Sequence, residues 1–286
     1  MPLLRRDGVD LSYESEGTGP SILLVQGAGT VGEAWRPQIA TLQRSFRCIS
    51  FDNRGMGGSG LPAGNLTIEA MASDALALMD ALGIDRFHVA GHSMGGLIAQ
   101  QIALLARARV ISLALMCTFA HGWQGSRLTP AMLVTALRMR IGTRQMRRNA
   151  FTELVMPAAY LRQVDRAKLA EQLAPLFGRD LAEQPPVVMK QVRAMSRFDA
   201  GPGLNTLSGI PTLVLSASED RIAEPRFGRE LAQLIPGARY VEIDGAGHGV
   251  TIQLADKVND LFVQHLRAAE TASAGPQQQL AVNLVP

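Results

Sequence analysis

Apolar residues along the chain follow two alternating patterns. Short continuous apolar runs, typical of strands buried on both faces, are followed by longer stretches in which apolar positions recur every three or four residues, as on one face of a helix. The predicted strands are 22–25, 48–51, 86–91, 110–117, 211–218 and 239–244. The predicted helices are 32–43, 67–82, 94–106, 225–235 and 250–268. This alternation predicts an α/β fold with a mostly parallel, doubly wound sheet.

The pattern changes at the start, in the middle and at the end of the chain. Residues 3–17 resemble a β-hairpin that turns at Asp7-Gly8. Between 119 and 207 there is no strand-like run, and helical stretches are interrupted at Gly142, Pro157, Gly178 and Pro185-Pro186. We therefore expect an α/β core of residues 1–118 and 208–269, an inserted helical cap of residues 119–207, and a mobile tail of residues 270–286.

Composition narrows the classes of function. The chain has 286 residues, which suits one hydrophobic core with an insertion. Its net charge of +3 is spread without a dense basic block, which argues against nucleic acid as a partner. No apolar run is long enough for a membrane span, and charge interrupts the first residues too soon for a signal peptide, so we expect a cytoplasmic protein. Cys48 and Cys117 both fall in apolar runs and are expected to be buried thiols.

One short motif indicates a nucleophile. Residues 91–95 read Gly-His-Ser-Met-Gly, a G-x-S-x-G match placed where a predicted strand ends and a predicted helix begins. Such a turn needs small neighbours, and it presents Ser93 at a helix N-terminus, where the helix dipole favours developing negative charge. The alternative is a glycine-rich turn in which the serine is incidental.

A serine nucleophile needs a base and an acid that orients the base. Of the five histidines, His248 alone lies in a glycine-rich loop after the last predicted strand, at the edge of the sheet where open α/β folds place their sites. The loop after the preceding strand offers Asp220, with Glu219 as the alternative. These positions predict a triad of Ser93, Asp220 and His248.

The glycine-rich loop after the first predicted core strand allows two interpretations. Gly27, Gly29 and Gly32 match the dinucleotide fingerprint G-x-G-x-x-G, and Asp52 ends the next strand, where a ribose-binding acid is expected. Against this interpretation, the fingerprint follows a hairpin instead of opening the fold, and the predicted triad would be left to coincidence.

Taken together, the motifs make the chain resemble the α/β-hydrolase superfamily, most closely its esterase, lactonase and cofactor-free perhydrolase branch. The order Ser93, Asp220, His248 is the order of that superfamily. The resemblance implies an oxyanion hole formed by the backbone N–H groups of Ala28 and Met94, with Gln26 where the family usually has histidine. It also implies that residues 51–60 form a structural turn, and that no metal or cofactor is required.

The expected function is therefore that of a carboxylesterase acting on a small-molecule ester. A perhydrolase or haloperoxidase-like enzyme, a lactonase and a C–C hydrolase remain alternatives on the same triad, and a ligand receptor with little turnover is an alternative of another class. The expected pocket residues are Gly27, Gly29, Phe119, Trp123, Ile222 and Val250. Methionines of the cap either pack its helices together or line the pocket.

The arginines of the cap bear on the charge of the substrate. Arg138, Arg140, Arg144, Arg147 and Arg148 lie close together in the sequence. Such a cluster can steer an anion, but on amphipathic helices it is more often a solvated outer face. We therefore expect small to medium, largely apolar esters to be preferred over an ester with a free carboxylate.

Overall fold

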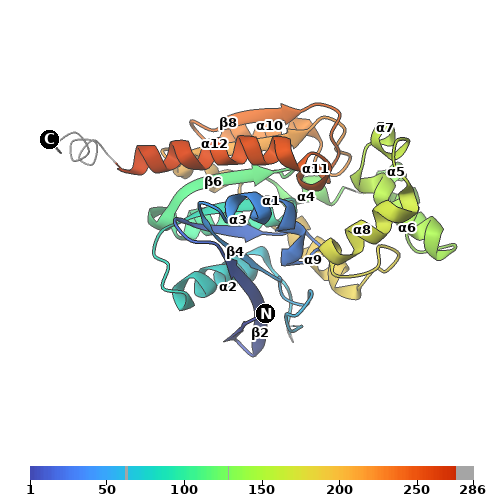
Figure 1. Ribbon diagram of the computed structural model, residues 1–286, viewed down its shortest axis with the longest axis horizontal. Helices are drawn as coiled ribbons and strands as arrows, with labels where there is room; N and C mark the ends of the chain where they lie inside the picture. The colour runs from blue at the N-terminus through green and yellow to red at the C-terminus, as the bar shows by residue number, and fades with distance from the viewer. Residues whose placement is uncertain (62–63, 128, 275–286) are drawn as a thin grey trace.

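One eight-stranded sheet runs through the molecule (Figure 1). The computed structural model describes residues 1–61, 64–127 and 129–274. The strands are β1 (Leu3–Arg6), β2 (Val9–Glu16), β3 (Ser21–Val25), β4 (Arg47–Phe51), β5 (Phe87–His92), β6 (Val110–Met116), β7 (Thr212–Ala217) and β8 (Arg239–Ile243). Their order across the sheet is β1-β2-β4-β3-β5-β6-β7-β8. The predicted α/β class is confirmed.

Strand direction divides the sheet into two parts. Strands β1 and β2 form an antiparallel hairpin, and β2 pairs antiparallel with β4. The hairpin turns at Asp7 and Gly8, both with positive φ (48° and 74°), as its two-residue turn requires. From β4 to β8 every pairing is parallel. All carboxyl ends of these strands therefore meet at one edge, where the site lies.

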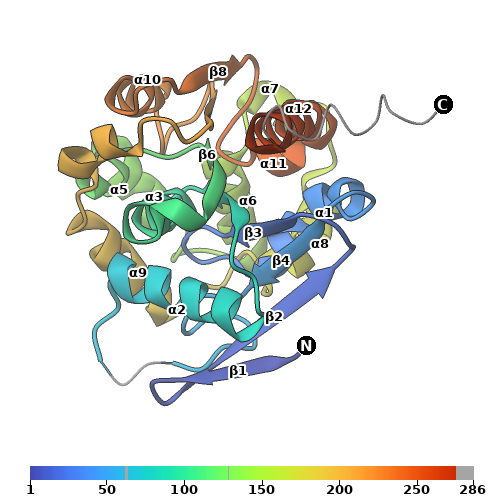
Figure 2. The same ribbon diagram turned by 90° about the vertical axis from the view of Figure 1, so that its left-hand side faces the viewer.

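Helices cover both faces of the sheet (Figure 2). On one face, α1 (Arg36–Leu42) packs beside α12 (Ala255–Ala274). On the other face lie α2 (Ile68–Ala81), α3 (Met94–Leu105) and α10 (Pro225–Leu234). Strands β3, β5, β6 and β7 are buried along nearly their whole length, which explains their continuous apolar runs.

Two predicted helices are each divided in the structure. The stretch 32–43 begins with a 3₁₀ turn, η1 (Gly32–Trp35), and continues as α1, whose second residue is a proline. The stretch 250–268 is divided into α11 (Val250–Gln253) and α12, because Leu254 has ψ of 49° and leaves the helical region. Periodicity did not detect either break, because the apolar spacing continues across both.

The predicted start of the tail at residue 270 is wrong, because α12 continues to Ala274. Its last turns are fixed to the core: Ala269 is buried, and the Glu270 carboxylate lies 2.9 Å from His88 Nε2. The remainder of the expected tail, residues 275–286, lies outside the described residues.

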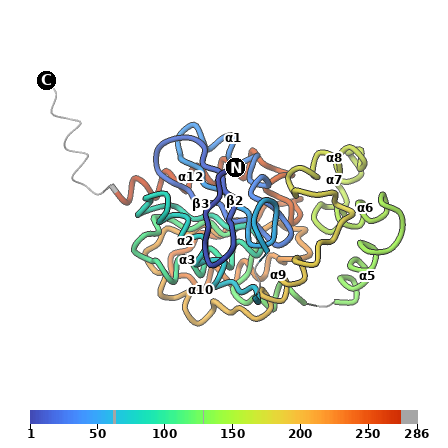
Figure 3. Tube along the Cα trace, turned by 90° about the horizontal axis from the view of Figure 1, so that it is seen from below, coloured from blue at the N-terminus to red at the C-terminus, as the bar shows by residue number. Residues whose placement is uncertain are grey.

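Between β6 and β7 the chain forms a helical insert, residues 119–207, most of which lies beyond the carboxyl edge of the sheet, whereas its last segment packs against the core helices α3 and α10 (Figures 1 and 3). Its helices are α4 (Gly122–Gly125), α5 (Pro130–Arg138), α6 (Arg144–Val155), α7 (Ala158–Leu161), α8 (Arg166–Phe177) and α9 (Pro186–Ser196), followed by the 3₁₀ helix η3 (Gly201–Leu207). The insert has a small apolar cluster of its own, which includes Phe151, Leu169 and Leu173. Each described helix of the whole molecule is too short or too polar to span a membrane.

Candidate active site

Ser93 stands at the sharp turn between β5 and α3. It has φ of 56° and ψ of −122°, a conformation that residues other than glycine rarely adopt. The end of β6 holds the turn from both sides: Ser93 N–H donates to the Met116 carbonyl at 3.0 Å, and Thr118 Oγ1 donates to the Ser93 carbonyl at 2.8 Å. The strain is therefore maintained by the Met116 backbone and the Thr118 side chain, and the serine side chain is left facing a pocket.

Three glycines allow this turn because other atoms approach them closely. A Cβ at Gly91 would lie 2.1 Å from the Gly95 carbonyl oxygen, and one at Gly95 would lie 2.1 Å from the Val25 carbonyl oxygen. A Cβ at Gly96 would meet the Thr118 side chain at 2.5 Å. Larger residues do not fit at these positions, so packing itself requires the glycines of the motif.

His248 and Asp220 lie beyond the ends of β8 and β7. His248 Nδ1 is 2.7 Å from Asp220 Oδ2, a hydrogen bond in which the ring donates. Asp220 is 4% exposed, whereas Glu219 is exposed to solvent. The structure therefore brings Asp220, and not Glu219, into contact with His248.

Asp220 is held in its charged form. Burial alone raises the pKa of Asp220, but the charge of His248 and the hydrogen bonds that the carboxylate accepts outweigh burial, so the pKa lies below its ordinary value. Asp220 Oδ1 accepts from the backbone N–H groups of Ile222 at 2.8 Å and Ala223 at 2.9 Å. The fixed carboxylate favours the tautomer of His248 with the proton on Nδ1, which leaves Nε2 able to accept one.

His92, the residue before Ser93, positions the His248 loop. His92 Nε2–H donates to the His248 carbonyl at 2.8 Å, and the two ring centroids are 4.8 Å apart. Burial, followed by repulsion from His248, lowers the pKa of His92 to about 3, so its ring is neutral near pH 7. No local sequence signal reveals this role, because the bond joins residues 156 positions apart.

The turn after β3 lies against the nucleophile. A Cβ at Gly27 would lie 3.1 Å from Ser93 Cβ. Gln26 Oε1 accepts from the Gly27 N–H at 3.1 Å, and Thr30 Oγ1 donates to the Gly27 carbonyl at 2.8 Å. Gln26 thus braces the turn at the position where the sequence departs from the usual histidine.

The bonds around Ala28 leave its own N–H group without an acceptor. On one side Gly27 N–H is bonded as described, and on the other Gly29 N–H donates to Gln191 Oε1 of α9 at 2.8 Å. Within the described residues neither Ala28 N–H nor the N–H of Met94, the first residue of α3, has a recorded acceptor. Both groups flank Ser93, where the resemblance places the oxyanion hole.

Asp52 has a structural role that conflicts with the dinucleotide interpretation. Its Oδ1 accepts from Gly32 N–H at 2.8 Å and its Oδ2 from Gly58 N–H at 2.9 Å, and the side chain is buried. Arg54 pairs with Asp74 next to this turn. Asp52 is therefore occupied in joining two turns of its own chain.

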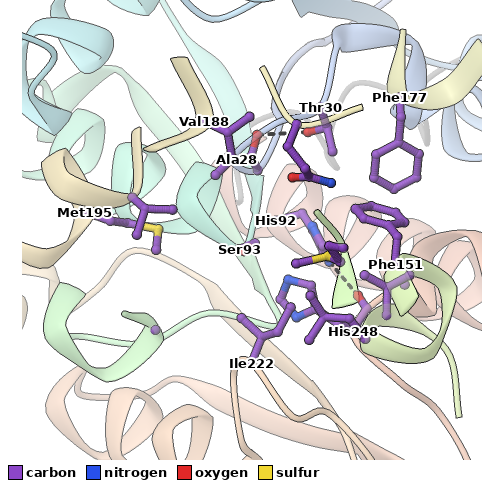
Figure 4. Close-up of a pocket in the computed structure, with 18 of the residues that line it drawn as sticks. Ala28, Thr30, His92, Ser93, Phe151, Phe177, Val188, Met195, Ile222 and His248 are labelled. Atoms are coloured by element: carbon purple, nitrogen blue, oxygen red, sulfur yellow. Dashed lines mark hydrogen bonds between the residues drawn. The ribbon is translucent and has the colours of Figure 1, made fainter. Parts of the chain in front are cut away.

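A pocket of about 300 Å³ opens over Ser93, between the core and the insert (Figure 4). Its lining is mostly apolar and comes from both regions. The lining residues from the core include Ala28, Ser93, His248 and Ile222, and those from the insert include Phe151, Phe177, Val188 and Met195. This arrangement suits a small organic ligand held against the serine.

Comparison with known proteins agrees with this geometry. The family model described as the alpha/beta hydrolase fold matches residues 20–253. The chain belongs to the α/β-hydrolase family. The resemblance inferred from the sequence is thereby confirmed, and the protein is a hydrolase by family.

Similar proteins of this family differ in the reactions that their names give. A relative from Azorhizobium caulinodans, provisionally named carbamate hydrolase RutD, is 31% identical over 92% of this chain and 97% of its own. A relative from Mycobacterium tuberculosis, provisionally named non-heme bromoperoxidase BpoC, is 30% identical over 90% of this chain and 97% of its own. The crystal structure of the enol-lactonase from Burkholderia xenovorans LB400 has a TM-score of 0.78 at 31% identity and covers 93% of this chain and all of the other.

Two of the six residues predicted to line the pocket of this α/β hydrolase do so, Gly27 and Ile222. The prediction is wrong for Gly29, which does not line the pocket. Its N–H group is hydrogen-bonded to Gln191, which does not line the pocket either. It is also wrong for Val250, which is fully buried in the core at the start of α11.

The predictions for the two aromatic residues are wrong as well. Phe119 is fully buried below α4, where a Cβ at Gly125 would lie 2.0 Å from the Phe119 ring. Trp123 is 54% exposed and stacks on His121 at 6.3 Å instead of facing the pocket. Both residues lie at the start of the insert, and their place in the sequence does not indicate which side of α4 each ring packs on.

The methionines of the insert serve both of the purposes considered. Met132, Met139, Met189 and Met195 line the pocket. Met156 is instead buried in the apolar cluster of the insert. Flexible, polarizable side chains thus form much of one wall of the pocket.

The arginines of the insert do not form one face. The side chains of Arg138 and Arg144 are more than half exposed, as expected of a solvated face. Arg140, however, lines the pocket, and so does Arg179, which sequence analysis missed. Arg179 is a single arginine that follows the end of a helix, and nothing in the neighbouring sequence indicates that it lines a pocket.

One group of residues near the site has metal-binding side chains. Ligand atoms of His92, Cys117 and His248 lie within 4.8 Å of one another. Burial raises the pKa of Cys117 well above its ordinary value, so its thiol stays protonated and is a poor ligand. His92 Nε2 and His248 Nδ1 are already engaged in hydrogen bonds. These features make the group poorly suited to a metal ion.

Proposed function

We propose that the protein is a serine hydrolase that cleaves small carboxylic esters through an acyl-enzyme. The observation that carries the proposal is the convergence of a strained, pocket-facing Ser93 with a buried Asp220–His248 pair at one edge of the sheet. The family includes many chemistries, so fold alone does not select this one.

The proposed reaction begins with attack of Ser93 Oγ on the ester carbonyl carbon. His248 Nε2 accepts the hydroxyl proton, and Asp220 stabilises the resulting imidazolium through the 2.7 Å hydrogen bond. His248 then donates that proton to the leaving alkoxide as the C–O bond breaks. Water, deprotonated by the same ring, hydrolyses the acyl-enzyme and restores Ser93.

Negative charge on the carbonyl oxygen is stabilised by the N–H groups of Ala28 and Met94. Each such donor contributes roughly 3–4 kcal/mol to lowering the barrier in comparable sites. Because Gly27 and Gly29 are hydrogen-bonded on either side, Ala28 N–H needs little reorganisation during the reaction. The dipole of α3 adds to this stabilisation at Met94.

The size and lining of the pocket support a small to medium acyl group. About 300 Å³ of mostly apolar space accommodates a short chain or a small ring. The lactone named for the structural neighbour is a cyclic ester, so lactones belong in the proposed substrate class. The bromoperoxidase name of another relative makes peroxide an acyl acceptor to test.

Covalent labelling tests the nucleophile. A fluorophosphonate probe should add to Ser93, as mapped by mass spectrometry, and Ser93→Ala should lose both labelling and esterase activity. Ser196→Ala, at an exposed position, is the matched control and should keep both. Active protein with an unlabelled Ser93 would overturn the proposal.

A substrate panel tests the reaction class. p-Nitrophenyl esters of graded acyl length, lactones, carbamates and C–C cleavage substrates would be compared, with peroxide-dependent halogenation measured alongside. Esters or lactones should give the highest kcat/KM. Faster peroxide-dependent halogenation would make the protein a perhydrolase, and tight binding with a single slow turnover would make it a ligand receptor.

A further inference from the structure

Arg179 brings an incompletely paired guanidinium to the pocket of Ser93. It follows Gly178, which ends α8 with φ of 64°, and lines the same pocket as Ser93. Its Nε and Nη1 atoms are buried, and neither has a hydrogen-bond partner among the described residues. Guanidinium remains charged in proteins. Buried donors of a charged group without acceptors are destabilising, and an acceptor on a ligand would remove that cost.

The pocket wall around Arg179 offers N–H donors and, among the described residues, no carboxylate. Arg140 lines the pocket, and so does Arg127, which pairs with Glu224 at 3.6 Å. Gln184 also lines it, and its buried Nε2 has no recorded partner there. Burial lowers the pKa of Arg179, and the charge of the exposed Glu183 only opposes this effect. The pocket therefore has an excess of positive charge and N–H donors.

The carboxylate of Asp180, the next residue in the sequence, already pairs with other arginines. Asp180 accepts from Arg148 Nε at 2.9 Å and also pairs with Arg144. Those contacts, first of all the hydrogen bond from Arg148, hold the pKa of Asp180 well below its ordinary value. Arg179 instead lies over the Phe151 ring, with Cζ 5.8 Å from the ring centroid. The ring supports the guanidinium without taking its N–H donors.

Ser93 and Arg179 lie near the two ends of one short turn. A Cβ at Gly27 would lie 3.1 Å from Ser93 Cβ, and a Cβ at Gly29 would lie 3.3 Å from Arg179 Nη2. Ser93 and Arg179 also line the same pocket. One small ligand in the pocket can therefore reach both the nucleophile and the guanidinium.

We propose that Arg179 binds a carboxylate on the acyl part of the substrate, so that the substrate is a half-ester or lactone of a short dicarboxylic acid. A planar guanidinium matches a carboxylate through paired N–H donors, and the buried Nε is one of the two groups such a pair uses. This inference rests on the proposed ester hydrolysis. It departs from the expectation of neutral esters, because Arg179, which is outside the arginine cluster singled out from the sequence, lines the pocket together with Arg140 of that cluster.

Matched substrates test the subsite. Mono-p-nitrophenyl glutarate carries a carboxylate where p-nitrophenyl pentanoate ends in a methyl group. The wild type should show a higher kcat/KM for the half-ester. In Arg179→Gln the ratio of the two values should fall about 10- to 100-fold, chiefly through KM. Arg179→Lys should recover part of it, and Arg138→Gln, at an exposed position that pairs with Glu153, should leave it unchanged.

A binding measurement separates the subsite from the chemistry. Glutarate is titrated calorimetrically into Ser93→Ala and into Ser93→Ala/Arg179→Gln, with the neutral dimethyl ester as control. Glutarate should bind at least 10-fold more weakly to the double variant. If glutarate binding depends on Arg179 but the wild type does not turn over esters, the proposed hydrolysis is wrong and the subsite is supported. Ester turnover with neither carboxylate preference nor Arg179-dependent binding would overturn the subsite, and tighter binding of a matched phosphonate would overturn the carboxylate assignment.

Discussion

The sheet core and the helical insert are built in opposite ways, although both border the same pocket. In the core, strands β5 and β7 are buried along their full length. In the insert, α5 has no buried residue, and seven of the eleven exposed large apolar side chains of the described residues lie between 119 and 207. They are Trp123, Leu133, Val134, Leu137, Ile141, Met146 and Met189.

The difference indicates a division of tasks. Groups that require exact placement, Ser93, His248 and Asp220, stand on turns fixed by buried strands. The insert instead supplies the arginine and methionine side chains of the pocket wall, where tolerance of shape is an advantage. Changes in the core should therefore affect reaction rate and stability, whereas changes in the insert should affect substrate choice.

The largest expected effect is on turnover and belongs to the core. Asp220→Asn should lower kcat by about four orders of magnitude, because an amide no longer holds the productive tautomer of His248. Glu219→Gln, one residue earlier and exposed, should stay near wild type. The measurement is kcat on a p-nitrophenyl ester, with circular dichroism to verify folding. If Glu219→Gln shows the loss and Asp220→Asn does not, the proposed triad is wrong.

Much of the core could be predicted from sequence because its signals are local. A buried parallel strand requires a continuous apolar run, and the turn at Ser93 requires glycine at 91 and 95, since a Cβ there would overlap backbone atoms. The acid and the base were placed by the same reasoning, because the strands before them end at one edge. The helix break at Leu254 was not predicted, because the spacing of apolar residues does not depend on the backbone angles of one residue.

The second effect compares stability in the two regions. Ile98→Ala, at a fully buried position of α3, should lower the free energy of unfolding by about 2–5 kcal/mol, because it leaves a cavity in a close-packed core. Leu137→Ala, on α5 and 58% exposed, should change it by less than about 0.5 kcal/mol. Urea denaturation measures both. Equal losses would show that the insert is as tightly packed as the core.

The pocket wall could not be predicted because its contacts are long-range. Arg179 faces Gly29, 150 positions earlier in the sequence, and its role depends on Asp180 being paired elsewhere. Phe119 and Trp123 were assigned to the pocket from their position at the start of the insert, yet one packs below α4 and the other points to solvent. Helical periodicity indicates that a face is apolar and does not indicate what that face contacts.

A third prediction concerns the bond that joins the two regions. Gln191 of α9 is fully buried, and its Oε1 accepts from Gly29 N–H at 2.8 Å. Gln191→Met should leave that N–H unpaired and loosen the turn that holds Ala28, so kcat should fall about 10-fold with a smaller change in KM. Lys190→Met, at the exposed neighbouring position, is the control. A loss confined to KM would mean that Gln191 shapes the pocket without supporting the oxyanion hole.

The smallest expected effect is a pH dependence of stability that arises in the core. Burial lowers the pKa of His265, on α12, to about 4. As pH falls below the ordinary histidine pKa of about 6.5, the unfolded chain takes up a proton that the folded protein does not, so stability is lost from there down to the folded pKa. The loss from this one residue between pH 7 and 6 should be somewhat under 1 kcal/mol.

His265→Gln should remove this contribution and make the free energy of unfolding vary less steeply over the same interval. Urea titrations at closely spaced pH values measure the slope, and Gln264→Ala, at the exposed position beside it, should keep the wild-type slope. His92, whose pKa burial lowers to about 3, should still contribute to the slope in the His265 variant. An unchanged slope in His265→Gln would place the acid sensitivity outside α12 and weaken the claim that buried histidines of the core control it.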